Sequence, residues 1–159
     1  MLKITIISVG GMKEKYFAEA IAEYEKRSSA FAQIKNINLK EEPTFDARDA
    51  EIAAALDAEG EQILKNLPPR AYKVALCVEG KQLSSEELAK KLEKLGGEGS
   101  STVNFVVGSS FGLSENFKQE CDFRLSMSPM TFPHELARVM LFEQVYRAFS
   151  INANSKYHK

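Results

Sequence analysis

The chain has 159 residues, 44 % of them apolar and 27 % charged, which is ordinary for one globular domain with its own hydrophobic core. No apolar run has the length of a membrane span and no N-terminal signal segment is recognisable, so we expect a cytoplasmic protein with no membrane partner. The net charge of −1 argues against tight binding to naked nucleic acid, but acidic residues concentrate between Glu41 and Glu61 and leave a positive balance elsewhere.

Cysteine and histidine usage speaks against disulfides and against a structural metal. Cys77 and Cys121 stand far apart and form no C-x-x-C pair, which favours two free, buried thiols. The chain has only two histidines, and no Cys or His residues stand at ligand spacing. We therefore predict no metal site.

Strands and helices alternate along the chain. The patterns predict strands at 3–9, 34–39, 72–78, 102–107 and 123–126, and helices at 13–27, 47–67, 84–95, 114–121 and from 132 or 133 to 150. Ser84 with Glu87 has the spacing of a capping box, and Ser114 can cap the short fourth helix. Gly80-Lys81 predicts a turn. The alternation indicates an α/β fold, with a mostly parallel sheet, helices on both faces and a single domain over 1–159.

Ligands of open parallel sheets bind outside the carboxyl ends of the strands. Three segments occupy such positions here, at 76–81, 106–113 and 125–134. The second carries Gly108 and Gly112, but it is not G-x-G-x-x-G and no ribose-binding acid follows at the usual distance. Taken alone, a tight turn before a capped helix explains it better than a dinucleotide site.

The last predicted helix combines charged and apolar faces. His134 and Arg138 stand four residues apart and share one face, whereas Glu143 and Arg147 lie on roughly the opposite face. His134 is either a functional residue or simply the first residue of the helix, and Arg138 is either functional or a member of a partly buried ion pair. Glu143 and Arg147 are better explained as structural. The helix is apolar on more than one flank, so we expect a second subunit to cover Leu141, Val145 and Phe149 in a homodimer.

Short segments spread over the whole chain carry a family resemblance. They are IISVG at 6–10, EYEKR at 23–27, EGEQIL at 59–64, EGK at 79–81 with Ser84-Ser85, MTFPH at 130–134, EQVYRA at 143–148 and YHK at 157–159. Each segment alone is a weak indication of a family, but all of them in this order and at this spacing are a specific one. The chain resembles the SPOUT superfamily of methyltransferases, and within it the bacterial enzymes that methylate N3 of a pseudouridine in 23S ribosomal RNA.

The resemblance implies a C-terminal trefoil knot, which is an exception to the rule that chains do not thread loops. It also implies S-adenosylmethionine as the cofactor and an active site at the dimer interface. The implied cofactor contacts are Leu76, Gly108, Met127, Ser128, Pro129, Met130, Thr131 and Phe132. One position departs from the family pattern, because Ser109 stands where a second glycine is usual; if that position needs a positive φ, Ser109 is strained.

The N3 of a uracil-like ring carries a proton that it must lose before it can accept a methyl group. The candidates for the base, or for a cation that stabilises the anion, are His134, Arg138 and His158, and Tyr157 can stack on the target base. The residues alone do not choose among these groups. We expect the tail, 157–159, to close over an active site, that of the partner subunit.

The expected substrate is ribosomal RNA, and the low net charge favours the assembled ribosome over free RNA. Two other functions fit the same sequence. One is a non-enzymatic ribosome-binding factor with the same fold, which the departure at Ser109 would permit. The other is a nicotinamide-dependent oxidoreductase that uses the Gly108 loop, against which the missing ribose-binding carboxylate argues.

Overall fold

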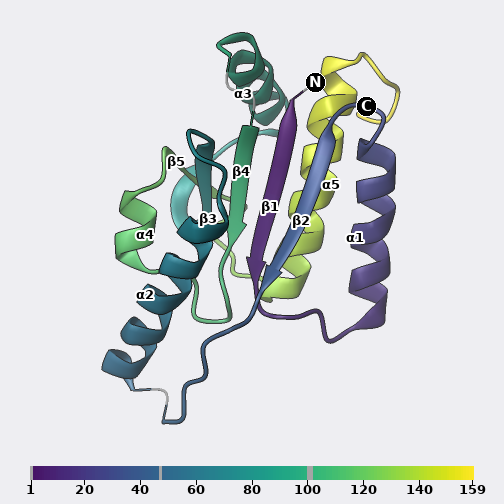
Figure 1. Cartoon of the computed structure of the whole chain (residues 1–159). Coiled ribbons are helices and arrows are strands. Elements are labelled where there is room, and N and C mark those ends of the chain that lie inside the picture. Colours follow the sequence, from purple (N-terminus) through teal and green to yellow (C-terminus); the bar gives the residue numbers. More distant parts are fainter. Residues whose placement is uncertain (1, 47, 100–101) are drawn as a thin grey trace.

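The computed structural model describes residues 2–46, 48–99 and 102–159. Five strands alternate with five helices along these residues (Figure 1). In chain order they are β1 (Lys3–Val9), α1 (Lys15–Ser28), β2 (Gln33–Leu39), α2 (Asp49–Asn66), β3 (Tyr72–Gln82), α3 (Ser85–Gly97), β4 (Thr102–Val107), α4 (Glu115–Gln119), β5 (Phe123–Ser126) and α5 (His134–Asn152). The predicted alternation of strands and helices is therefore confirmed.

All strand pairings in the sheet are parallel, and the strand order is β2-β1-β4-β3-β5. The carboxyl ends of the five strands consequently lie at one edge of the sheet. In Figure 1 this edge is at the bottom, where α5 begins, and both termini lie at the opposite edge. The predicted fold class, a parallel sheet with helices on both faces, is confirmed; the trefoil knot stays a prediction.

Two hydrophobic clusters hold the helices against the two faces of the sheet. The larger cluster joins α1, α3 and α5 to one face, where Ile4 and Ile6 of β1 meet Leu141 and Val145 of α5. The smaller cluster joins α2 and α4 to the other face through Ile63 and Phe117. Because successive residues of a strand point to opposite faces, β1 and β4 supply apolar side chains to both clusters. These strands are the doubly covered centre of the sheet.

The burial of α5 corrects the predicted dimer contact. Leu141 and Val145 are fully buried within one chain, and Phe149 packs against the same cluster. These side chains are therefore covered by their own sheet and by α1 and α3, not by a second subunit. The amphipathic pattern indicated correctly that the helix is buried, but it did not show what covers it.

The predicted turn at Gly80-Lys81 is wrong, because β3 continues to Gln82. Its pairing with β5 shifts register between Leu76 and Lys81, so residues 77–80 bulge out and the strand then resumes beside Leu125. A side chain at Gly80 would place its Cβ 2.8 Å from the backbone of Arg124, and only glycine allows this approach. The glycine marks a close contact between strands, not the end of one.

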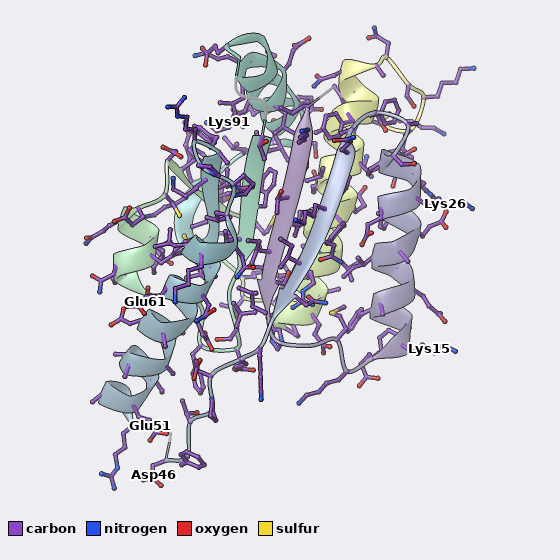
Figure 2. All side chains as sticks on the ribbon, in the orientation of Figure 1. Lys15, Lys26, Asp46, Glu51, Glu61 and Lys91 are labelled. Carbon is purple, nitrogen blue, oxygen red and sulfur yellow. The ribbon has the colours of Figure 1, made fainter. Side chains whose placement is uncertain are left out.

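Charged side chains are distributed unevenly over the surface of the fold. Asp46 and Glu51 lie together at the free tip of α2, whereas Lys15 and Lys26 project from the outer side of α1 (Figure 2). The acidic stretch that begins at Glu41 thus forms one tip of the molecule, whereas α1 carries both signs of charge, with Lys15 paired to Glu19 and Arg27 paired to Glu23. Over the described ranges, none of the helices combines the length and apolar character needed to cross a bilayer.

Candidate functional site

A cavity of about 480 Å³ opens at the carboxyl edge of the sheet. It is built from the bulge of β3, from the end of β4 and the loop after it, from the segment that follows β5 and from the first turn of α5. Eight of the residues singled out from sequence line it: Leu76, Gly108, Met127, Ser128, Met130, Thr131, Phe132 and His134. Pro129, predicted with them, is not part of the lining. Segments that are far apart in sequence therefore meet in one pocket of the size that small ligands occupy.

The loop after β4 folds back tightly on itself. The backbone N–H of Gly112 donates to the carbonyl of Ser109 at 2.9 Å, and Gly112 adopts a φ of +86°, which favours glycine. A Cβ at Gly108 would lie 2.3 Å from the carbonyl oxygen of Gly112. Any side chain at Gly108 would therefore force the loop open.

The expected strain at Ser109 is absent. Among the described residues other than glycine, only Arg70 and Asn154 have a positive φ. The left-handed residue of this loop is Gly112, so Ser109 needs no special backbone geometry. Its side chain is instead almost fully buried, and its hydroxyl donates to the Glu59 carboxylate at 3.0 Å.

Glu59 is a buried carboxylate that the sequence interpretation left without a role. One oxygen accepts from Ser109 and the other accepts from the backbone N–H of Glu42 at 2.8 Å. Burial raises the pKa of the Glu59 carboxyl, although these two hydrogen bonds act to lower it. The available signal was an acidic residue directly before a helical glycine, Gly60, but that pattern by itself does not indicate burial.

The bulge of β3 brings charge to the pocket. Cys77, Val78 and Glu79 line it together with Lys118 of α4, whose ammonium group is bonded to the carboxylates of Glu79 and Glu115. The bond from Lys118 holds the pKa of Glu79 below its ordinary value. Burial raises the pKa of the Cys77 thiol, so this cysteine is poorly suited to act as a nucleophile.

The loop between β5 and α5 forms the apolar side of the pocket. The side chain of Met130 is 73 % exposed, and Phe132 and Phe111 are also exposed at this edge. The loop satisfies some of its own polar groups, since the Ser128 hydroxyl accepts from the backbone N–H of Met130 at 3.0 Å. Exposed apolar side chains around a concave site are suited to cover a flat ring such as a purine.

His134 and Arg138 occupy different environments although they share a helix face. His134 is half-buried and lines the pocket, and its Nε2 lies 3.8 Å from the position that a Cβ of Gly10 would take. Arg138 is fully buried outside the lining. Its guanidinium donates to the carbonyl of Gly10 and to Asn38 Oδ1, at 2.8 and 3.1 Å. The single chain thus presents His134, but not Arg138, to a ligand.

The whole chain matches one known protein family. The family model described as "Predicted SPOUT methyltransferase" matches residues 2–158, essentially the whole chain. The chain belongs to the SPOUT methyltransferase family. The resemblance noted from sequence is therefore confirmed.

SPOUT relatives match along their full length. A protein from Methanococcus maripaludis is 45 % identical over 159 residues, covering 99 % of this chain and 100 % of the relative. A protein from Exiguobacterium sp., named ribosomal RNA large subunit methyltransferase H, is 43 % identical with the same coverage. A crystal structure of a probable methyltransferase from Bordetella pertussis Tohama I shares the fold, with a TM-score of 0.59 at 16 % identity over 93 % of this chain and 96 % of that one.

In this SPOUT chain, the predicted tail residues lie away from the pocket. The Tyr157 hydroxyl donates to Glu143 at 3.1 Å, and its ring packs edge-on against Tyr146 with centroids 4.7 Å apart. The His158 ring bonds to Arg147 at 3.0 Å and to Glu86 at 2.7 Å. The C-terminus lies at the sheet edge opposite the start of α5 (Figure 1). The tail and His134 are not brought together within one chain.

Proposed function

We propose that this protein is an S-adenosylmethionine-dependent methyltransferase that modifies N3 of a pseudouridine in 23S ribosomal RNA. The observation that carries the proposal is the meeting of the three predicted segments in one pocket at the carboxyl edge of the sheet. Family membership and the names of full-length relatives support methyl transfer to large-subunit ribosomal RNA. The choice of pseudouridine N3 rests on the sequence resemblance.

The pocket fits the proposed cofactor. Its volume suits a nucleoside-sized ligand, Phe132 and Met130 offer apolar cover for a purine, and the strand-end loop 126–132 offers backbone groups for its polar edge. Leu76 and Gly108 form the opposite wall in this assignment. When bound, S-adenosylmethionine supplies a methyl group attached to a positively charged sulfur.

His134 is the group of this chain best placed to take the N3 proton of the target base. A neutral imidazole can accept a proton near physiological pH, and His134 is the only one of the four predicted catalytic residues in the lining. In this proposal Arg138 is a positioning residue outside the pocket. It donates to the carbonyl of Gly10, which lies beside His134, and does not touch the substrate.

The predicted tail residues need a second subunit. The tail folds back along α5 and Tyr157 contacts Glu143, which lies about 14 Å along the helix from His134, so Tyr157 and His158 stay outside the pocket lining of their own chain. In an antiparallel homodimer through α5, they would approach the pocket of the partner. Leu136 and Met140 suit such a contact, because both are half-buried and belong to neither core cluster.

The substrate we propose is the assembled ribosome in the cytoplasm. The acidic tip that carries Asp46 and Glu51 disfavours an extended phosphate backbone (Figure 2). A ribosomal surface, by contrast, can present one base to a pocket without wrapping the protein in RNA.

The decisive experiment incubates the purified protein and S-adenosylmethionine with ribosomes from cells that lack the gene, followed by mass spectrometry of nuclease fragments. We expect one added methyl group on a pseudouridine of 23S ribosomal RNA, and much less product with deproteinised RNA. Ribosome binding without methylation, and without heat in a titration with millimolar S-adenosylmethionine, would instead identify a non-enzymatic binding factor.

A further inference from the structure

Three segments that are distant in sequence meet at Glu59: the connection after β2, the loop after β4 and helix α2. The connection after β2 crosses the end of β1 toward α2 (Figure 1), and the loop after β4 meets it where the Ser110 hydroxyl donates to Glu41 at 3.1 Å. Glu59 of α2 joins both, since its two oxygens accept from the Ser109 hydroxyl at 3.0 Å and the Glu42 N–H at 2.8 Å. At 4 % exposure this carboxylate is nearly removed from water, so these hydrogen bonds replace its hydration.

The position of Glu59 is set by helix packing. The next residue, Gly60, lies where α2 meets α4, and a Cβ there would stand 3.1 Å from Ser114 Oγ and 3.2 Å from Phe117 Cβ. One turn further along α2, Ile63 is fully buried in the smaller core cluster. The carboxylate is thus held on a rigid support to which the pocket loop can be attached.

Ser109 connects this support to the pocket wall. It follows Gly108, pairs with Gly112 in an isolated bridge, and is 4 % exposed. A hydrogen bond to a charged acceptor is stronger than one between neutral groups, and breaking it would leave a buried carboxylate oxygen without a donor. Movement of the loop away from α2 is therefore opposed at one specific atom pair.

We propose that Glu59 is a positioning residue for the cofactor loop and acts through the Ser109 hydroxyl. The proposal rests on the function proposed above, because it takes the 108–112 loop as a wall of the S-adenosylmethionine site. A side-chain hydrogen bond from Ser109 holds the loop at the position where the family pattern led us to expect a second glycine. Neither residue touches the reacting groups in this assignment.

A double-mutant cycle tests this coupling. The variants are Ser109→Ala, Glu59→Ala and the double variant, and the readout is S-adenosylmethionine affinity by calorimetry. Ser109→Ala should lose about tenfold in affinity, and Glu59→Ala, which also removes the acceptor of the Glu42 N–H, should lose at least as much. The double variant should lose no more than Glu59→Ala, because the bond to Ser109 is already absent there. In ribosome methylation, KM for the cofactor should rise while kcat at saturating cofactor stays within about twofold.

Glu59→Gln provides the conservative rescue. Its amide can accept from the Glu42 N–H and donate to the Ser109 oxygen, so affinity should stay within about threefold of the wild type. Glu61→Ala, an exposed carboxylate on the same helix (Figure 2), is the matched control and should bind as the wild type does. Ser109→Ala and Glu59→Gln keep the test open even if Glu59→Ala does not fold.

Amide hydrogen exchange of the 108–112 loop, measured without cofactor, separates this proposal from the proposed function. We expect faster exchange in Ser109→Ala and Glu59→Ala than in the wild type and in Glu61→Ala. Losses of affinity that add in the double variant, or an unchanged exchange rate in Ser109→Ala, would overturn the coupling. If the variants show this difference in exchange but the wild type binds no S-adenosylmethionine, the proposed function alone is refuted.

Discussion

The guanidinium of Arg138 donates a 2.8 Å hydrogen bond to the backbone carbonyl of Gly10 and thereby joins α5 to the end of β1. A second bond reaches Asn38 at the end of β2. Burial lowers the pKa of Arg138, yet a guanidinium stays protonated in proteins. One buried cation thus ties three elements together directly beside the residue we propose as the proton acceptor, His134.

This arrangement predicts that Arg138→Lys destabilises the fold. An ammonium group cannot reproduce the fork that reaches both acceptors, and a buried acceptor left unpaired costs about 1–3 kcal/mol. The free energy of unfolding from urea titrations should fall by that amount. Arg48→Lys, which alters an exposed pair with Asp46, is the control and should change it by less than about 0.5 kcal/mol. Equal losses in the two variants would contradict the role of the buried fork.

Gly108→Ala should abolish S-adenosylmethionine binding while the protein stays folded. The added Cβ would lie 2.3 Å from the Gly112 carbonyl oxygen, so the loop must open. We expect affinity to fall by more than about a hundredfold in a calorimetric titration. Gly96→Ala is the matched control, because a Cβ there meets nothing within 4 Å and alanine favours the helix. Wild-type affinity in Gly108→Ala would remove this loop from the cofactor site.

Met140→Glu should convert the proposed homodimer into a monomer. The side chain lies on the outer stripe of α5 with Leu136, and a buried carboxylate in an apolar interface is costly. Sedimentation equilibrium at micromolar concentration should give a dimer for the wild type and a monomer for the variant. Lys26→Glu, on the outer side of α1 (Figure 2), makes a similar change away from the interface and should leave the dimer intact.

Deletion of Tyr157–Lys159 should spare cofactor affinity and reduce ribosome methylation at least about tenfold, which is roughly 1.4 kcal/mol of transition-state stabilisation. Mixed dimers can then show which pocket the tail serves. A truncated subunit paired with a full-length Gly108→Ala subunit has one intact pocket and one intact tail, on different chains. Activity in this heterodimer is expected if the tail acts on the partner, and its absence would place the tail on its own pocket.

Glu59 should also leave a signature in the pH dependence of stability. Burial raises its pKa in the folded protein above the ordinary value of 4.5, and the nearby Glu41 and Glu42 charges act in the same direction. The folded state therefore binds this proton more tightly, and the resulting stabilisation is present below 4.5 and lost as the pH rises through the raised value. The stability of the wild type relative to Glu59→Gln should decrease over that range in urea titrations. An increase would show that the hydrogen bonds outweigh burial.

Local sequence patterns were enough to predict most strands and the helix caps. The strands at 3–9, 102–107 and 123–126 lie as predicted, because short apolar runs bounded by turn residues have few alternatives. Ser84 forms the predicted capping box and Ser114 the predicted cap, each with a backbone N–H three residues ahead. The segments at 106–113 and 125–134 also meet as expected, since parallel strands present their carboxyl ends at one edge, and the bulge of β3 joins them there.

The tertiary structure decided what depends on residues far apart in the chain. Ser109 and Glu59 are 50 positions apart, and Arg138 and Gly10 are 128 apart, yet each pair shares a hydrogen bond. No periodicity or spacing encodes such a contact, because it exists only after the sheet and both helix layers have assembled. The sequence by itself determined that α5 is buried and that the glycines serve close contacts. Only packing decided which surface covers the helix and which backbone approaches each glycine, because these contacts join residues that are far apart in the chain.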